Sequence, residues 1–262
     1  MSEMKPQHHV FLQYFMSKGL VDSKGVRNLF KLCCKDMVDA SSMSSQSEWM
    51  QQLANFVIII NNNIRPFHLN ILKGFDEDDG TSYYCLVNTC DNAVTRLSTD
   101  YSVNELELFK LFLDRIMSSS DASVGSVQAL NLTHELEKKM SKDDAQRFFD
   151  RMVNEKWLKR TLRGKLQLST RSILELDNHI RKMYPDLVEL CNICNRLCLQ
   201  GQSCLKCMAK LHIFCAKRYF ENQAEPKCPK CYTPWTNTNQ NRESVRRSSR
   251  RDTRMSYEQM EE

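Results

Sequence analysis

Residues 191–231 read CNICNRLCLQGQSCLKCMAKLHIFCAKRYFENQAEPKCPKC and decide the fold of this part of the chain. Cysteines recur here in pairs separated by two residues, and in one pair a histidine replaces the first cysteine. One tight turn can direct both side chains of such a pair at a single ion, and zinc takes four sulfur or imidazole ligands at tetrahedral corners. Four successive pairs therefore predict two zinc ions. The eight predicted ligands are Cys191, Cys194, Cys204, Cys207, His212, Cys215, Cys228 and Cys231.

The pairs can be combined in two ways. Sequential pairing puts the first two pairs on one zinc and the last two on the other. Interleaved pairing is favoured, because the short step from Cys207 to His212 then serves as the crossing between sites. Both ions would be saturated by protein ligands and therefore structural, each contributing on the order of 10 kcal/mol to folding. Interleaving groups Cys191 and Cys194 with His212 and Cys215, and Cys204 and Cys207 with Cys228 and Cys231.

One further cysteine of this stretch, Cys198, fits neither spacing and is interpreted as a bystander thiol. The chain holds 12 cysteines, a number that could form disulfides in a small secreted protein. However, Met1 to His9 is polar and no apolar signal region follows it. The longest apolar run, Phe56 to Ile60, is far shorter than the ~20 residues of a bilayer span. These features predict a soluble intracellular protein with no membrane partner, whose cysteines bind metal.

The net charge of +5 is unevenly distributed. Residues 1–190 hold 24 Lys and Arg against 25 Asp and Glu, residues 191–235 hold 7 against 2, and residues 236–262 hold 6 against 5. A general nucleic-acid binder would be basic throughout, so the sequence argues against that class. The tail 237–262 is polar and predicted to be disordered. Its run Arg246 to Arg251 is open to three interpretations: a nuclear localisation signal, a nucleic-acid patch or a solubilising segment.

Upstream of the metal pattern, the same order of elements is predicted twice. Apolar residues at helical spacing indicate three helices, and strand-like runs joined by a turn then indicate a hairpin. Asp22 or Ser23 is a candidate N-cap in the first segment, and Ser141 begins a capping box in the second. The first segment has helices from 10 to 19, from about 24 and over 49–60, and strands over 67–75 and 81–87. The second has helices from about 104, over 126–132 and after 141, strands over 157–162 and 165–169, and a last helix ending before Pro185.

Helix, helix, helix and hairpin, found twice, predict tandem winged-helix domains. The predicted fold class is therefore α+β multidomain, with winged-helix domains over 1–100 and 101–185. A small two-zinc cross-braced domain follows over 186–236, and the tail occupies 237–262.

A winged helix often binds DNA by inserting its third helix into the major groove. The third helix of the first domain presents Gln51, Gln52 and Asn55 rather than cations, and its hairpin turn, residues 76–80, is acidic. Phosphates would repel that turn. The second hairpin carries Lys159, Arg160, Arg163 and Lys165. A solvated wing is favoured there over a DNA contact, and protein scaffolding is the expected role of the pair.

The ligand order of four cysteines, one histidine and three cysteines resembles the variant RING and PHD finger families. Three residues favour RING: Ile193, Tyr219 and Pro229 match positions that form the groove for a ubiquitin-conjugating enzyme in RING ligases. PHD fingers usually carry Trp two residues before the seventh ligand, where this chain has Pro226. The resemblance therefore argues against a chromatin reader.

Residues 5–235 as a whole resemble the non-SMC element 1 family, the RING subunits of the complex built on the fifth and sixth structural-maintenance-of-chromosomes proteins. The resemblance implies a nuclear, chromosome-associated DNA-repair and recombination protein with ubiquitin-protein ligase activity. It also implies a MAGE-family subunit and a kleisin subunit as partners.

Such a ligase has no catalytic residue of its own and acts by proximity and orientation of a charged conjugating enzyme. Active RINGs often place Arg or Lys just after the eighth ligand, where this chain has Tyr232. This departure predicts partner-dependent activity. The alternative function is a non-catalytic scaffold whose zinc domain docks partner subunits.

Overall fold

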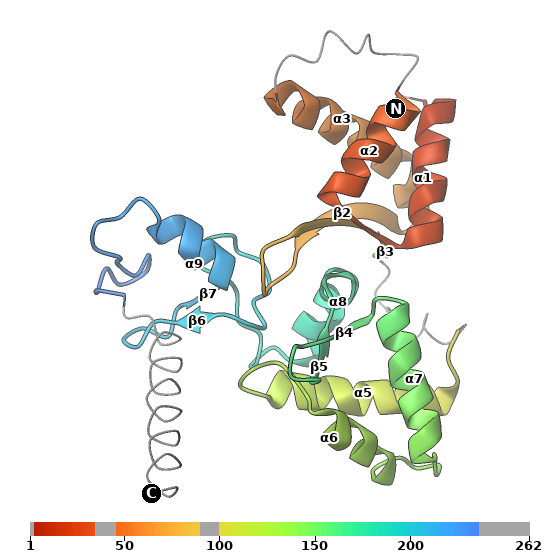
Figure 1. Ribbon diagram of the computed structural model, residues 1–262, viewed down its shortest axis with the longest axis vertical. Coiled ribbons are helices and arrows are strands. Elements are labelled where there is room, and N and C mark those ends of the chain that lie inside the picture. Colours follow the sequence, from red (N-terminus) through yellow and green to blue (C-terminus); the bar gives the residue numbers. More distant parts are fainter. Residues whose placement is uncertain (1–2, 35–45, 90–99, 236–262) are drawn as a thin grey trace, which may run out of the picture. The chain divides into compact units, whose positions relative to one another are not determined.

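The computed structural model describes residues 3–34, 46–89 and 100–235. The chain divides into two compact units, residues 1–188 and 189–262, and Figure 1 labels their elements. The predicted disordered tail, with the run Arg246 to Arg251, lies outside the described residues. Within those residues, no helix combines the length and apolar character needed to cross a membrane.

The first half of unit one begins with three helices packed around an aromatic core. Phe11 and Phe15 of the first helix are fully buried, and the Phe56 ring of the third lies 5.2 Å from the Phe11 ring. The second helix begins where the Asp22 side chain accepts a hydrogen bond from the Gly25 N–H, which confirms one of the two N-cap candidates. The helices are α1 (Pro6–Lys18), α2 (Ser23–Cys33) and α3 (Gln46–Ile64).

A three-stranded antiparallel sheet, in the order β1-β3-β2, takes one strand from between α1 and α2 and two from after α3. The predicted strand start at Phe67 is wrong, because the segment around Pro66 forms a 3-10 turn and His68 takes a left-handed φ of 58°. The strand Leu20–Asp22 was not predicted, since three residues pair with a strand more than sixty positions away and leave no periodic pattern. The elements are β1 (Leu20–Asp22), η1 (Arg65–Phe67), β2 (Leu69–Phe75) and β3 (Ser82–Asn88).

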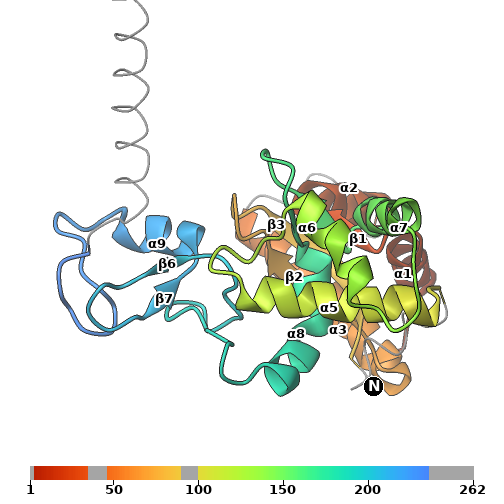
Figure 2. The ribbon, with the colours of Figure 1, turned by 90° about the horizontal axis from the view of Figure 1, so that it is seen from below.

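The second half repeats the order of helices and hairpin. Side chains of Ser102, Ser141 and Ser169 each accept a hydrogen bond from a first-turn N–H and so begin three of its helices. The rings of Phe112 and Phe149 lie 5.2 Å apart and join two of these helices, α5 and α7, which Figure 2 shows from below. The elements are α5 (Val103–Ser118), α6 (Ser126–Asn131), η3 (Leu132–His134), α7 (Lys142–Asn154), β4 (Leu158–Arg160), β5 (Leu166–Leu168) and α8 (Thr170–Met183).

The sheet of the first half is covered on both faces. Ile71 and Leu86, opposite each other across β2 and β3, pack against the helices α1 to α3. Gly74 lies on the other face, where an added Cβ would be 2.8 Å from Leu174 Cδ1 and 2.9 Å from Thr170 Cγ2. Those residues belong to α8, which lies on the opposite side of the sheet from α1 to α3 (Figure 1). This packing explains why residues 1–188 form one compact unit although two repeated patterns build them.

We expect Gly74→Val to destabilise unit one by about 1–3 kcal/mol, the usual cost of added volume in a filled core. The valine side chain would need the space of Leu174 and Thr170 and would push α8 from the sheet. Urea denaturation of the full chain, followed by far-UV circular dichroism, measures the change. A variant as stable as the parent would show that α8 can yield without cost.

Three of the four cations of the second hairpin form ion pairs with carboxylates of the same unit. Lys159 Nζ lies 2.8 Å from Asp76 Oδ1 and 2.7 Å from Asp78 Oδ2, both in the acidic turn of the first half. Although burial disfavours the charge, hydrogen bonds to these carboxylates raise the pKa of Lys159. Salt bridges likewise hold Arg160 to Asp150 at 2.5 Å and Lys165 to Asp121 at 2.7 Å. Cations already paired in this way are poorly placed to contact DNA phosphates.

Candidate metal centre

Three of the four ligand pairs lie in turns of one repeated geometry, called knuckles here. In each knuckle the residue after the second cysteine takes a left-handed φ of 56–58°, and its N–H donates to the carbonyl of the first cysteine. The N–H of each first cysteine donates in turn to the carbonyl five residues on, at 2.9 Å. These bonds aim both sulfurs of a knuckle the same way. The knuckles are Cys191–Asn195, Cys204–Met208 and Cys228–Tyr232.

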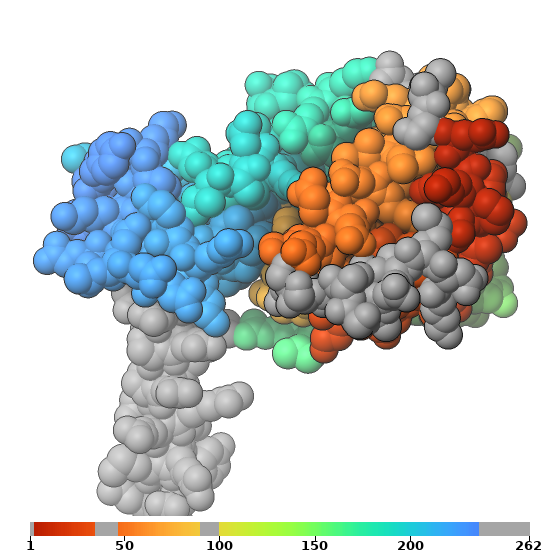
Figure 3. Space-filling model, turned by 90° about the horizontal axis from the view of Figure 1, so that it is seen from above, coloured from red at the N-terminus to blue at the C-terminus, as the bar shows by residue number. Residues whose placement is uncertain are grey.

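The fourth pair, His212 and Cys215, is held by a helix instead. His212 is the N-cap of α9 (Ile213–Phe220), and the Ala216 N–H donates to its carbonyl at 2.9 Å. The short hairpin of β6 (Gln202–Ser203) and β7 (Lys210–Leu211) leads into this helix. Figure 3 shows the described residues of this unit in blue, as a closely packed body.

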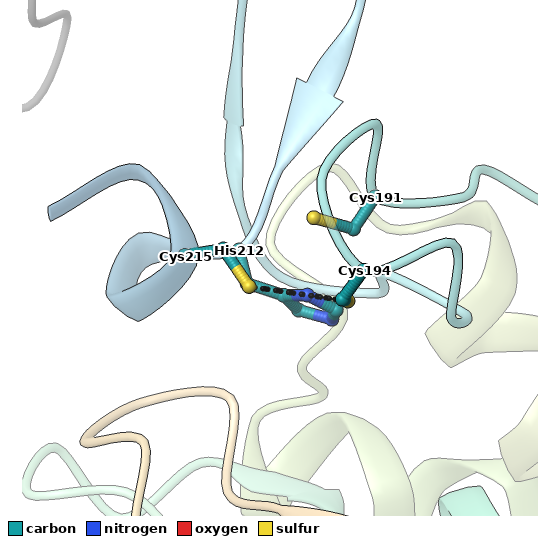
Figure 4. Close-up of side chains that lie close together, drawn as sticks. All are labelled: Cys191, Cys194, His212 and Cys215. Carbon is teal, nitrogen blue, oxygen red and sulfur yellow. Dashed lines mark hydrogen bonds between the residues drawn. The ribbon is translucent and has the colours of Figure 1, made fainter. Parts of the chain in front are cut away.

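The first ligand group comprises Cys191, Cys194, His212 and Cys215, whose ligand atoms all lie within 4.8 Å of one another. Figure 4 shows these side chains converging from the first knuckle and the start of α9. His212 Nδ1 lies 3.4 Å from Cys194 Sγ and 3.8 Å from Cys215 Sγ. Sulfur and nitrogen on one tetrahedral zinc are about 3.6 Å apart, so this spacing fits the ion.

The histidine is oriented by the backbone. His212 Nε2 lies 3.0 Å from the Leu197 carbonyl oxygen, which can only accept, so Nε2 carries the proton and donates. The tautomer leaves the lone pair of Nδ1 directed at the sulfurs, the arrangement typical of a metal-bound histidine. No feature of the sequence marks Leu197 for this role, because a backbone carbonyl is common to every residue.

The second group comprises Cys204, Cys207, Cys228 and Cys231, again with ligand atoms within 4.8 Å of one another. The sulfurs of Cys204 and Cys231 are 3.6 Å apart, as are those of Cys207 and Cys228. Sulfurs sharing one zinc lie about 3.8 Å apart, so this group also fits. Thr233 Oγ1 lies 2.9 Å from Cys231 Sγ, a contact that sequence reasoning missed.

The grouping is the interleaved one, in which each centre takes ligands from two pairs that are not adjacent in sequence. Burial, together with the neighbouring Cys191 and Cys194, raises the pKa of the Cys215 thiol to about 12. In the same group, burial opposes ionisation of Cys191, but its contact with the His212 side chain and hydrogen bonds from backbone N–H groups lower its pKa to about 6. Thiols crowded in this way ionise unequally on their own, whereas a coordinated divalent cation deprotonates all of its cysteine ligands. The donor set therefore suits a thiolate-binding metal.

Cys198 lies in neither of these four-residue groups. It is 1 % exposed, and its Sγ donates to the Gln200 carbonyl at 3.3 Å. It packs with Leu211 and Ala216 in the small core beside the first group. This position agrees with the interpretation of a bystander thiol.

The residues expected to face a conjugating enzyme are distributed over both groups. Ile193 lies between the ligands of the first knuckle and is 38 % exposed, and Tyr219 lies near the end of α9 and is 37 % exposed. Pro229 lies between Cys228 and Cys231 of the third knuckle and is half-buried. Tyr232, directly after the eighth ligand, is 74 % exposed.

Interleaved ligand groups built on knuckles, a short hairpin and one helix define the class of cross-braced metal-binding domains. Residues 191–231, from the first ligand to the last, match the RING-like domain. Residues 8–176 match the family described as the Nse1 non-SMC component of the SMC5-6 complex. The chain therefore belongs to the Nse1 family.

Relatives and a solved structure agree with this assignment. The chain is 37% identical to the non-structural maintenance of chromosomes element 1 homolog of Xenopus laevis, over 87% of this chain and 82% of the relative. It is 36% identical to the Homo sapiens homolog, over 90% and 86% of the two chains. It is also similar to a chain in a structure of the Nse1-Nse3-Nse4 complex, with TM-score 0.77, 36% identity and coverage of 90% and 99%.

Proposed function

We propose that this protein is a RING-type ubiquitin ligase subunit of the SMC5-6 complex, acting in DNA repair and recombination on chromosomes in the nucleus. The observation that carries the proposal is the pair of interleaved ligand groups, with apolar Ile193 and Pro229 between ligands of the two groups. In RING ligases, residues at these positions and at that of Tyr219 contact the conjugating enzyme. Family membership and the RING-like match add support.

In this proposal the eight ligands hold two structural zinc ions. Each group supplies four donors, so no position remains open for a water molecule and the metal takes no part in catalysis. The zinc ions fix the knuckles that carry Ile193 and Pro229. Transfer is then accelerated because the docked conjugating enzyme is held near a target lysine.

The proposed partners of unit one are the MAGE-family and kleisin subunits of the same complex. A similar chain is found in the Nse1-Nse3-Nse4 complex, which supports this assignment. Two modules, each with helices and a hairpin, are proposed to be tandem winged-helix domains. Lys159, Arg160 and Lys165 are already paired with carboxylates and are therefore not free to bind DNA phosphates. This favours a protein-binding role for the two modules over a DNA-binding one.

The ligase proposal predicts a specific loss in Ile193→Ala. Ubiquitin discharge from the cognate conjugating enzyme should fall roughly tenfold, the typical cost of truncating an anchoring residue at an interface. Zinc content and binding to the MAGE-type partner should not change, since the Ile193 side chain is exposed and donates no ligand. Discharge is measured across a panel of conjugating enzymes, with and without that partner.

Leu205→Ala is the matched control, because Leu205 is 70 % exposed and also lies between two ligands of a knuckle. It should leave discharge unchanged. Equal discharge by Ile193→Ala and the parent would remove Ile193 from the proposed groove.

The second candidate function is a non-catalytic scaffold, and Tyr232 favours it. An exposed tyrosine stands where active RINGs often have Arg or Lys. If Ile193→Ala lost partner binding while keeping both zinc ions, Ile193 would belong to a subunit interface and the scaffold would be the better description.

A further inference from the structure

The second residue between the two ligands of each pair differs in chemistry between the two groups. In both pairs of the four-cysteine group this residue is a lysine, Lys206 between Cys204 and Cys207 and Lys230 between Cys228 and Cys231. In the group that contains the histidine, the same position is apolar in both pairs, being Ile193 and Phe214. A lysine at this position is thus found in both pairs of the four-cysteine group and in neither pair of the group that contains the histidine.

The formal charges of the two centres differ in the same way. Zinc with four thiolates keeps two negative charges, whereas zinc with three thiolates and a neutral imidazole keeps one. We propose that Lys206 and Lys230 are the counter-charges of the four-cysteine centre, where their ammonium groups stabilise the bound thiolates and slow the loss of zinc. The inference rests on the proposed occupation of both centres by zinc.

The geometry holds each lysine next to the sulfurs. The Lys230 backbone N–H donates to Cys228 Sγ at 3.4 Å, so this residue lies directly over the centre. The Lys206 N–H makes the equivalent bond to Cys204 in the second knuckle. Both lysines are exposed, and from these points their flexible four-carbon side chains can bring the ammonium groups near the thiolates.

Neither lysine is committed to a carboxylate. Two of the other three lysines of this unit are paired: Lys210 Nζ lies 2.6 Å from Glu189 and Lys227 Nζ 3.7 Å from Glu225. Among the residues that the structure describes, Lys206 and Lys230 form no ion pair with an acidic side chain. Their charges therefore remain available to the centre between them.

The negative charges of the zinc centres also explain the basic composition of this region. Residues 191–235 hold 7 Lys and Arg against 2 Asp and Glu when the cysteines are counted as neutral. Two zinc centres with seven thiolates and one imidazole add three negative charges, which offset more than half of that excess. The loaded unit is therefore close to neutral and has little positive field to attract a nucleic acid.

The test compares the zinc release of full-length protein with that of Lys206→Gln/Lys230→Gln. The parent should hold two zinc ions. In the double variant one of them should pass to a chelator roughly tenfold faster, the lower end of what loss of a group supporting a metal ligand costs. The other zinc should leave at the parental rate. High salt should reduce the difference, because it screens exposed charges. Cobalt in place of zinc identifies the affected centre by its absorption spectrum.

Two sets of variants separate charge from other effects. Lys206→Arg/Lys230→Arg keeps the charge and should release zinc like the parent. Lys24→Gln/Lys31→Gln removes two exposed lysines of α2 and should change nothing, although its net charge equals that of the test variant. If the double glutamine variant does not fold, each single variant should show a smaller acceleration of about threefold.

The outcomes are distinct. A parent with fewer than two zinc ions would refute the proposed zinc centres themselves. With two zinc ions in the parent, equal release by the parent and the glutamine variants would overturn the counter-charge proposal. Unchanged release together with weaker binding of a short labelled DNA duplex would overturn it in favour of a nucleic-acid contact at Lys206 and Lys230.

Discussion

Cys204→Ala should leave the protein with one zinc ion and a largely unfolded second unit, while residues 1–188 stay folded. The substitution removes a ligand of the four-cysteine group, and the structural zinc supplies on the order of 10 kcal/mol that so small a core cannot replace. Beside this group the buried core comprises little more than the ligands and Ala209. His212→Ala should have a similar effect through the other group. Elemental analysis gives the zinc count, and hydrogen exchange locates the unfolding.

Cys198→Ala is the control for this experiment. Cys198 is a buried cysteine of the same unit outside both four-residue groups, so both zinc ions should remain. A Cys204→Ala protein that kept two zinc ions and parental protection from exchange would refute the assignment of Cys204 as a ligand.

Phe56→Ala should destabilise the first unit by about 3–5 kcal/mol, as expected for loss of a buried aromatic ring. The Phe56 ring is the centre of a cluster, with centroids 4.2 Å from His8, 5.2 Å from Phe11 and 5.2 Å from Phe30. Its removal leaves a cavity between α1, α2 and α3. Urea denaturation of the full chain, followed by circular dichroism, gives the change in the free energy of unfolding.

The neighbouring Ile58→Ala is a matched comparison on the same helix. Ile58 is 53 % exposed, so its truncation should change stability by less than about 0.5 kcal/mol. A similar loss in both variants would mean that the helix itself, and not the aromatic cluster, determines the effect.

The helices could be predicted because their signals are local. Asp22 and Ser141 were named as N-cap candidates from the sequence, and both cap helices in the structure. The packing between the halves could not be predicted in this way. Lys159 is bound to Asp76, 83 positions earlier, and no periodic pattern connects residues so far apart. A basic hairpin and an acidic turn could therefore be read from the sequence, but not the pairing of Lys159 with that turn.

The ligand groups, like the helices, were predictable because their signal is local in the sequence. The spacing of each pair fixes its two sulfurs on one turn, and the short step from Cys207 to His212 favours the interleaving that the structure shows. The orientation of His212 by the Leu197 carbonyl and the contact of Thr233 with Cys231 depend on three-dimensional packing. Neither follows from residue type or spacing.

The position of α8 has a consequence for how the protein is made. The outer face of β2 and β3 is complete once Asn88 has left the ribosome, but α8 ends at Met183, about 95 residues later in the chain. At ~5–20 residues per second, that face stays uncovered for about 5–20 s on every nascent chain. Fragments that end between the two repeated patterns never receive this cover and should aggregate.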